Sequence, residues 1–544
     1  MLVSPPRLWT RLLLTVVVTA FAMTGQALVS PYESFDGTNN NTANPSWGAA
    51  DAELLRGASG AHYADGISSM GGVGRPSPRA ISNALFSQLT SVPSTVDHSD
   101  YIWTWGQFLD HDFGLTPGVV EAEPVTVPTG DPIFGVPTLP FNRSIFNPAT
   151  GTTTANPRQQ INLISAYIDG NTVYGSNLSP FAAPDRPSWL RTHVGGRLKT
   201  TSAAVGDLLP YNDGTIPNAG SPEAPDTSPE FFVAGDIRVN EQPTLAVIQT
   251  LFVREHNYQA ARLAAENPSL SDEELYQQAR RIVIAEIQAI TYEEFVPALL
   301  GAGALHPDGS YDPNVNAGIA QVFSTAAYRL GHTLLSTSIQ QIDAYGVSMP
   351  FTLRDMFFRP TPPLLNAEGI EPILRGLAAQ RAQDLDIRVI DDVRNFLFAN
   401  EPPFPGLDLV SLNIQRGRDH GLPDFNTVRV DFGLEPKTFS QITANASVAA
   451  SLQALYGTAT NIDLFAGLLA EDDLPGKIVG ETLQAILADQ FERSRAGDRF
   501  FYTHALSGQE LARIRTTRLS DIIKRNTSIR DIQQNVFFVR ARGN

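Results

Sequence analysis

The chain has 544 residues, of which 42% are apolar and 17% are charged, as is ordinary for a folded globular protein. Its formal net charge of −17 argues against a nucleic-acid binder or a protein held on anionic lipid, since both need a basic surface. The sequence contains no cysteine, which excludes disulfide bonds, thiolate metal sites and cysteine nucleophiles.

Residues 1–27 have the pattern of a secretory signal peptide. Arg7 and Arg11 precede the apolar run LLLTVVVTAFAMTGQA, which ends in a small-residue cleavage pattern at Ala27. The run is short for a membrane span, and an uncleaved anchor is the alternative. We therefore expect an exported protein, secreted or periplasmic, with no membrane span after cleavage.

Residues 28–544 are predicted to form a single large, mainly α domain with long ordered loops and little β structure. Loops of such length in a compact domain usually serve a site. Apolar residues recur at helical spacing in three segments, and Ser271 with Glu274 predicts a capping box at the second. The predicted helical segments are 243–266, 271–300 and 480–495. The loop-rich segments are about 32–55, 117–157 and 212–230.

The stretch WTWGQFLDHDFGLTP, residues 103–117, places polar groups within a mostly apolar segment. If it is helical, Gln107 and His111 stack at i and i+4 with Asp110 beside them, whereas Asp112 points away. The first three could therefore address one cavity while Asp112 serves something behind it. For this segment alone, a structural histidine with satisfied hydrogen bonds is the commoner explanation.

The segment LISAYIDGNTVYGS carries Ser165, Tyr167, Asp169 and Asn171 two positions apart. In an extended loop such residues alternate onto one side. Hydroxyl, carboxylate, amide and backbone carbonyl oxygens are hard donors, and Asp112 would complete a Ca²⁺ site of the usual size. A surface turn explains the segment equally well.

Three further segments carry polar groups that are ambiguous one by one. In AGDIRVNEQPTL, Arg238 and Glu241 precede a helix, and a cation near a buried histidine would keep its imidazole neutral. In AQVFSTAAYRLGHTLL, His332 on an apolar helix follows Gly331, which would let a flat, bulky ligand approach the backbone. Structural ion pairs or a core histidine explain each segment as well. The third segment, VSLNIQRGRDHGLPDF, crowds Asn413, Arg416, Arg418 and Asp419 between apolar residues.

Taken together, these segments resemble the animal-type haem peroxidases, the peroxidase–cyclooxygenase superfamily. The matching stretches occur in the family's order and span about Phe35 to Phe537, which makes the resemblance specific. The arm segment TNNNT lacks the family's frequent cysteine, which favours a bacterial-type member. The matching stretches include FDGTNNNTANPSWGAA, WGQFLDHDFGLTP, SAYIDGNTVYGS, AGDIRVNE, LFVREHN, YRLGHTLL, LNIQRGRDHGLPDFN, NIDLFAGLLAE and RNTSIRDIQQNVF.

The resemblance implies a peroxidase that binds haem b and uses H₂O₂ as oxidant. His111 is similar to the distal histidine, which moves a proton between the two peroxide oxygens, while Gln107 and Arg238 help polarise the O–O bond. His332 looks like the proximal iron ligand, and Asn413 looks like its hydrogen-bond acceptor. A ferryl intermediate would then oxidise a halide or pseudohalide, or phenols one electron at a time.

The same resemblance implies ester links from Asp110 and Glu241 to haem methyl groups, and propionate contacts from Arg329 and Arg416. Gln242 stands where the mammalian myeloid enzyme has a haem-linked methionine, so bromide, iodide and thiocyanate are better expected substrates than chloride. The implied calcium ligands are Asp112, Ser165, Tyr167, Asp169 and Asn171.

Two alternatives remain. Fatty-acid dioxygenases of this superfamily carry a radical-forming tyrosine three residues before the proximal histidine, where this chain has Arg329, and Tyr328 is expected on another face. The other alternative is an adhesion or matrix protein with a peroxidase domain, although the chain has no Arg-Gly-Asp and no repeats. We expect H₂O₂ and small anionic or phenolic reductants as partners, and the oligomeric state stays open.

Overall fold

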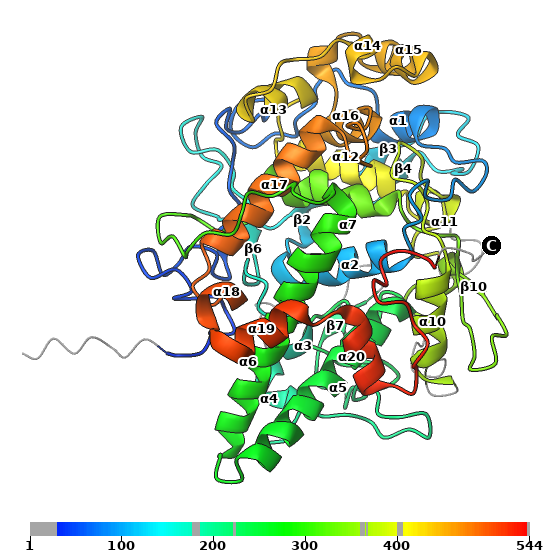
Figure 1. Cartoon of the computed structure of the whole chain (residues 1–544). Coiled ribbons are helices and arrows are strands. Elements are labelled where there is room, and N and C mark those ends of the chain that lie inside the picture. The colour runs from blue at the N-terminus through cyan, green and yellow to red at the C-terminus, as the bar shows by residue number, and fades with distance from the viewer. Residues whose placement is uncertain are drawn as a thin grey trace, which may run out of the picture. The chain divides into compact units, whose positions relative to one another are not determined.

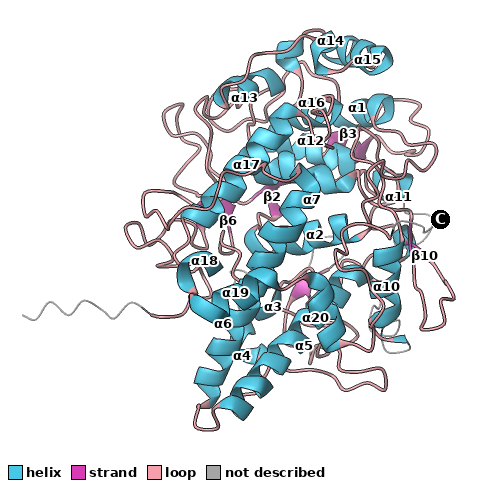
Figure 2. Ribbon diagram, in the orientation of Figure 1, coloured by secondary structure: helices cyan, strands magenta, loops and turns pink. Residues whose placement is uncertain are grey.

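The computed structural model describes residues 30–176, 185–220, 225–359, 365, 368–399 and 406–540, so the predicted signal peptide lies outside the described part. From Tyr32 onward the chain forms one unit. Helices dominate it, and short strands and long loops connect them (Figure 1, Figure 2). The predicted fold class, mainly α with long loops, is therefore confirmed.

The helices range from single turns to the 24 residues of α5. None of those in the described ranges combines the length and the apolar character that crossing a bilayer requires. The α-helices are α1 Pro78–Leu85, α2 Tyr101–Phe113, α3 Asn171–Tyr174, α4 Arg186–Leu190, α5 Pro243–Glu266, α6 Asp272–Ile290, α7 Val296–Leu300, α8 Gln321–Thr325, α10 Glu371–Ala379, α11 Asp391–Arg394, α12 Leu409–Asp419, α13 Phe425–Asp431, α14 Phe439–Ile442, α15 Ala446–Tyr456, α16 Leu464–Ala470, α17 Glu481–Ala496, α18 Tyr502–Ala505, α19 Gly508–Thr516 and α20 Leu519–Asn526. A π-helical turn, η1, covers Thr291–Phe295, and the 3₁₀ turns are η2 Ala327–His332, η3 Leu353–Asp355 and η4 Ala459–Asn461.

Within the described ranges the strands pair in twos, as antiparallel ribbons within the loops. The longest, β2, runs beside β5 with a shift in register between Gly118 and Ala122. These ribbons are the little β structure that the sequence predicted. The pairs are β1 Ala52–Glu53 with β6 Ile161–Asn162, β2 Gly118–Ala122 with β5 Asn142–Ser144, β3 Val125–Thr126 with β4 Thr138–Leu139, β7 Asn218–Ala219 with β8 Pro225–Asp226, and β9 Ser338–Ile339 with β10 Phe351–Thr352.

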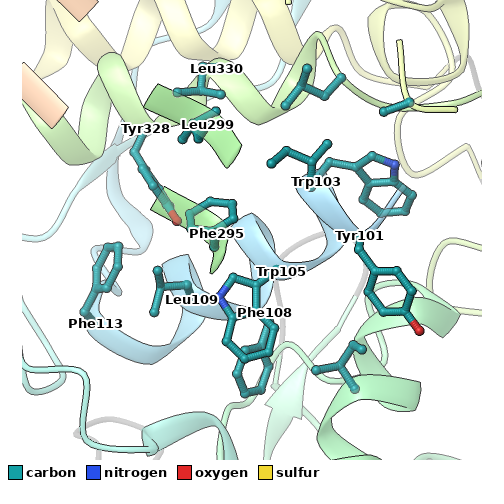
Figure 3. Close-up of a cluster of buried hydrophobic side chains, with 14 of the residues drawn as sticks. Tyr101, Trp103, Trp105, Phe108, Leu109, Phe113, Phe295, Leu299, Tyr328 and Leu330 are labelled. Carbon is teal, nitrogen blue, oxygen red and sulfur yellow. The ribbon is translucent and has the colours of Figure 1, made fainter. Parts of the chain in front are cut away.

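Helix α2 carries the predicted polar stretch through the main apolar core (Figure 3). The Trp105 ring lies 5.2 Å from that of Phe108 and 5.7 Å from that of Phe252 on α5. The helix also packs against α3 and η2. Because each large apolar side chain contributes about 1.5–3 kcal/mol on burial, this packing holds α2 firmly. The polar side chains of its last two turns are therefore held in place.

Helices α5 and α6 form an antiparallel pair beside α2. Helix α5 has the predicted bounds and begins with Pro243, a residue whose missing N–H costs nothing at this position. Ser271 and Glu274 form the predicted capping box of α6. The predicted helix 271–300 is interrupted, however, by the π turn η1. Pro297 has no N–H to donate, and Val296 N–H bonds to Thr291, one residue further back than in an α-helix.

The segment around His332 also differs from the predicted apolar helix. Helix α8 ends at Thr325, and Ala326 adopts φ −131° and ψ −63° before the 3₁₀ helix η2 begins. With three residues per turn, Arg329 and His332 eclipse each other instead of diverging.

Buried ion pairs, in a chain without disulfides, join segments that are distant in sequence. Arg79 pairs with Asp131 and with Asp408, both at 2.8 Å, and all three side chains are inaccessible. Removing one partner of such a pair costs roughly 3–5 kcal/mol, because it strands a buried charge. Other pairs of this kind are Arg143–Asp419, Arg418–Asp463 and Arg429–Glu471.

Candidate active site

A cavity of about 310 Å³ lies between α2, η2 and the segment that precedes α5. Asp112 is not part of its wall, and Asn413 stands behind His332. The apolar wall includes Trp103, Phe295, Leu299, Tyr328 and Leu330, which Figure 3 draws. The polar wall includes Gln107, Asp110, His111, Arg238, Glu241, Arg329, His332 and Arg416. The structure thus brings together residues from four separate sequence motifs.

His111 is buried and uncharged at neutral pH. Burial and the charge of Arg238 together lower the pKa of its imidazole to about 3, although Asp236 opposes the shift. Its Nδ1 lies 3.4 Å from Oδ1 of Asp236, and its Nε2 lies 3.7 Å from Oε2 of Glu241. A neutral imidazole in this position can accept a proton.

Arg238 is held in place by Asp236, a residue that the sequence analysis missed. The Arg238 Nη2 donates to Oδ2 of Asp236 at 2.8 Å and to the carbonyl of Gly114 at 3.0 Å. Asp236 is fully buried, and the arginine charge keeps the pKa of this carboxylate below its ordinary value despite burial. The residue was detectable, because the segment AGDIR places Asp236 two positions before Arg238.

Two carboxyl groups face the cavity without a cationic partner in contact. Burial raises the pKa of Asp110, and it raises that of Glu241 to about 7. Gln107 Nε2 donates to Oε2 of Glu241 at 2.8 Å, and Gln242 Nε2 donates to Oε1 of Gln107 at 3.0 Å. The position where a methionine link was considered is therefore filled by an amide that orients Gln107.

His332 lies at the end of η2 with its Nδ1 2.7 Å from Nδ2 of Asn413. Burial and Arg329 lower the pKa of the imidazole to about 3, so the ring is neutral at pH 7 and one of its two nitrogens carries no proton. As placed, the Asn413 amide donates to Nδ1. A metal bound at Nε2 would leave the imidazole proton on Nδ1, and the amide would then turn over so that its oxygen accepts from Nδ1–H. A Cβ added at the adjoining Gly331 would meet no heavy atom within 4 Å, which leaves room for a flat group.

Arg329 and Arg416 add positive charge to the cavity wall. Arg329 Nε donates to the Ser324 carbonyl at 3.0 Å. Arg416 Nη1 reaches Oδ2 of Asp419 at 3.0 Å, and its guanidinium lies over the Phe141 ring at 4.2 Å. Both arginines are thus positioned by other groups and can meet an anionic substituent.

On the far side of α2, Asp112 meets the 165–171 loop. Its carboxylate accepts from the backbone N–H groups of Gly170 at 3.2 Å and Thr172 at 3.0 Å. Oδ2 of Asp169 and Oδ1 of Asn171 are buried and have no partner among the described residues. Burial raises the pKa of Asp169, and its neighbour Asp112 raises it further, as expected of two carboxylates that lack a cation.

The remaining predicted calcium ligands lie in the same loop. Ser165 Oγ accepts from the Tyr167 N–H at 3.2 Å, and the Tyr167 hydroxyl donates to the Trp47 carbonyl at 2.7 Å, so only its backbone carbonyl is available to a metal. No group of three or more His, Cys, Asp or Glu side chains with metal-ligand geometry occurs in the described ranges. The predicted set contains only two carboxylates, and oxygen atoms of other types make up the rest.

Tyr328 lines the cavity, contrary to the expectation that it would lie on another face. The cavity extends around this turn, so that the consecutive residues 328–332 of η2 all line it, whichever face they occupy. The Tyr328 ring stacks on that of Phe323 at 4.8 Å and lies 5.4 Å from that of Phe113. Arg329 still occupies the position three residues before His332.

The cavity brings together two neutral histidines, an arginine beside one of them and further basic groups at its wall, an arrangement that suits a flat, anionic metal cofactor. Comparison with known proteins gives the family. Residues 32–537 match the family model described as "Animal haem peroxidase". The chain belongs to this family, and it is a peroxidase that acts on peroxide as acceptor.

Named relatives cover most of the chain. It is 35% identical to peroxinectin A of Dictyostelium discoideum over 524 residues, which cover 93% of this chain and 95% of that protein. It is 33% identical to thyroid peroxidase of Mus musculus over 94% of this chain and 61% of that protein. The chain thus spans nearly all of the first relative and less than two thirds of the second.

Solved structures of other proteins share the fold of this chain. Peroxidase A from Dictyostelium discoideum superposes with a TM-score of 0.84 at 34% identity, covering 94% of this chain and all of that one. A fatty acid α-dioxygenase of Oryza sativa has a TM-score of 0.76 at 21% identity, covering 94% of this chain and 88% of that one, which shows a shared fold only.

Proposed function

We propose that the cavity holds haem b between His111 and His332, with Nε2 of His332 as the iron ligand and Asn413 holding its Nδ1. When bound, the haem takes oxidising equivalents from H₂O₂ and passes them to a donor. Arg329 and Arg416 would meet its propionates. The observation that carries this proposal is the convergence of two neutral histidines, the buried His111 and the half-buried His332, on one cavity, supported by the open space at Gly331.

In the proposed mechanism, His111 takes a proton from one peroxide oxygen and returns it to the other, so that water leaves. The low pKa of the imidazole keeps it available as a base at neutral pH. Arg238 supplies positive charge for the developing anion, and Gln107 can donate a hydrogen bond to the peroxide.

Asp110 and Glu241 are proposed to form ester links to haem methyl groups. Both carboxyl groups face the cavity, and burial favours their uncharged forms. Extraction with acid butanone tests the link, since haem that moves fully into the organic layer would refute it. The variants Asp110→Asn and Glu241→Gln should each loosen the attachment.

A Ca²⁺ ion is proposed to join α2 to the 165–171 loop through Asp112, Ser165, the carbonyl of Tyr167, Asp169 and Asn171. The two unpartnered oxygen atoms and the mutual effect of the carboxylates support it. Metal analysis of active enzyme should give calcium, and its absence from active enzyme would remove the proposal.

The proposed donors are bromide, iodide, thiocyanate and small phenols, because the cavity is small and its wall carries fixed positive charge. Gln242 at the methionine position argues against chloride. Arg329 at the tyrosine position argues against fatty-acid oxygenation, which oxygen uptake with linoleate would reveal. We also propose that residues 1–27 direct export, and N-terminal mass determination of the exported protein tests this.

Reconstitution with hemin tests the proposal as a whole. We expect a Soret band and peroxide-dependent oxidation of a panel of halides, thiocyanate and guaiacol. His111→Ala should keep the Soret band and lose about 10²–10⁴-fold in rate. An exposed control, His62→Ala, should change neither. A colourless protein, or full activity in His111→Ala, would contradict the proposal.

A further inference from the structure

A continuous series of aromatic rings leads from the haem cavity to a second pocket. The Tyr328 ring lines the cavity, and its centroid lies 6.1 Å from that of Phe491. Phe491 meets the Tyr292 ring edge-on at 5.9 Å. Tyr292 lies 4.9 Å from Phe501, which in turn lies 4.8 Å from Tyr502. Every step is within the range of direct ring contact, so electrons can pass between neighbours.

The second pocket has a volume of about 240 Å³ and is partly open to solvent. Tyr292 is half-buried in its wall, and Glu293 and Arg515 are exposed. Its mixed polar and aromatic wall suits a phenol better than an aliphatic ligand. The residues that matter here are Tyr292, Glu293, Arg495, Phe501, Tyr502 and Arg515.

The π turn η1 sets up this pocket. Tyr292 points to Phe491 and Phe501, while Glu293 beside it reaches Tyr502 and the solvent. Such turns are rare and often occur at functional sites. A plain α-helix through 291–295 would give these neighbouring side chains different directions.

The three tyrosines of the series differ in the group that can accept their phenol proton. This difference determines which tyrosine is oxidised to a stable radical. An oxidised phenol is a strong acid and must release its proton. Tyr328 Oη has no hydrogen-bond partner within the described part of the chain, and Tyr292 Oη donates only to the Phe491 carbonyl at 2.7 Å. Tyr502 Oη donates to Oε1 of Glu293 at 2.7 Å, and a carboxylate can take the proton.

Charge favours the same end point. The Arg495 guanidinium lies 5.9 Å from the Tyr292 ring centroid, so positive charge on that ring is disfavoured. Tyr502 instead donates to the carboxylate of Glu293, whose charge Arg515 at 3.8 Å offsets only in part. Electron loss is therefore easiest at Tyr502.

We propose that this pocket is a second oxidation site, which serves phenol groups carried on molecules too large for the haem cavity. It rests on the peroxidase activity proposed above. Tyr502 gives one electron through Phe501, Tyr292, Phe491 and Tyr328 to the haem cavity, and its proton goes to Glu293. The docked phenol then gives one electron and one proton to Tyr502, leaving as a phenoxyl radical. H₂O₂ takes two electrons from the cavity and two protons from the solvent to become two waters. The exposed Glu293 releases its proton to the solvent after each transfer, so one peroxide drives two such transfers.

The test compares two donors in the haem-loaded protein and its variants. Iodide enters the cavity directly, whereas a phenol tethered to a large polyethylene glycol cannot. Tyr502→Phe and Glu293→Gln should each lower oxidation of the tethered phenol at least tenfold and leave iodide oxidation unchanged. Tyr345→Phe, at a 92% exposed tyrosine, is the matched control and should affect neither donor.

A second measurement does not depend on turnover. After freeze-quenching with H₂O₂ and no donor, electron paramagnetic resonance should detect a tyrosyl radical that Tyr502→Phe removes and Tyr345→Phe retains. Equal oxidation of the tethered phenol by wild type and Tyr502→Phe, or an unchanged radical signal, would overturn the proposal. If the haem-loaded wild-type protein did not oxidise iodide, that result would instead contradict the peroxidase function on which this second site depends.

Discussion

Asp236 shows how much one carboxylate can organise. It accepts three hydrogen bonds from Arg238, one of them from the backbone N–H, and lies 3.4 Å from Nδ1 of His111, so it positions both the cation and the base. It touches neither peroxide nor haem in the proposed site, and it acts through the two residues beside it.

Replacing Asp236 should therefore weaken catalysis without abolishing it. Asp236→Asn keeps the size of the side chain and removes its charge, and we expect the rate of peroxide consumption to fall about 10–100-fold. Stopped-flow measurement with saturating iodide gives the rate, and the Soret band reports that haem is retained. Asp213→Asn, at an exposed carboxylate, is the control. An unchanged rate would show that Arg238 holds its place alone.

Asp100, immediately before α2, gives a pH-dependent prediction at the same scale. Burial raises the pKa of this carboxyl to about 7, although Trp103 and Ser336 donate to its Oδ1 at 2.9 and 2.8 Å. In the unfolded chain the carboxyl ionises near pH 4. The folded state therefore loses stability as pH rises from about 4 to about 7, and the loss persists above that.

Asp100→Asn keeps an acceptor for both donors and cannot ionise. Denaturant unfolding should find the variant and the wild type similar at pH 4, and the variant more stable by up to about 4 kcal/mol at pH 8. A variant that is less stable at every pH would mean that the folded protein prefers the ionised carboxylate.

Among the elements, the segment before α5 depends on close backbone contact with the 171–175 turn. A Cβ at Gly235 would stand 2.0 Å from the Asn171 carbonyl oxygen and 2.6 Å from the Gly175 nitrogen. Only glycine lets this segment lie so close, and the segment carries both Asp236 and Arg238.

Gly235→Ala should destabilise the fold by roughly 1–3 kcal/mol and reduce activity about 10²-fold, because the segment must shift. Thermal unfolding and iodide oxidation check the two effects. Gly135→Ala, where an added Cβ meets nothing within 4 Å, should be neutral. A stable but inactive Gly235→Ala would show that the shift is confined to the site.

For the whole molecule, the haem cavity lies within the apolar core, so binding should stabilise the entire fold. A ligand at 100 times its Kd adds about 2.7 kcal/mol. Protein produced without haem should therefore gain Tm as hemin is titrated in, and His332→Ala should gain less. A Tm that does not respond to hemin would place the ligand elsewhere.

The sequence predicted those parts of the molecule that depend on local pattern. Helix α5 and the α6 capping box follow from apolar spacing and end residues, and the i, i+4 pair Gln107–His111 does share a cavity wall. The π turn η1 and the 3₁₀ helix η2 were not predicted, because the apolar periodicity was interpreted with α-helical geometry alone. The ring series from Tyr328 to Tyr502 and the contact of Asp236 with His111 join segments that are distant in sequence, so no local pattern predicts them.

The buried arginine–carboxylate pairs have a consequence for how the protein is handled. These ion pairs involve no sulfur, so thiol reagents do not affect them. The protein can therefore be produced in a reducing cytosol. Protons can disrupt them. Arg418 holds the pKa of Asp463 below the ordinary value, and His420 with Arg416 does the same for Asp419, so the contribution of these pairs disappears only in strong acid. These pairs are thus expected to withstand both reductants and mild acidity.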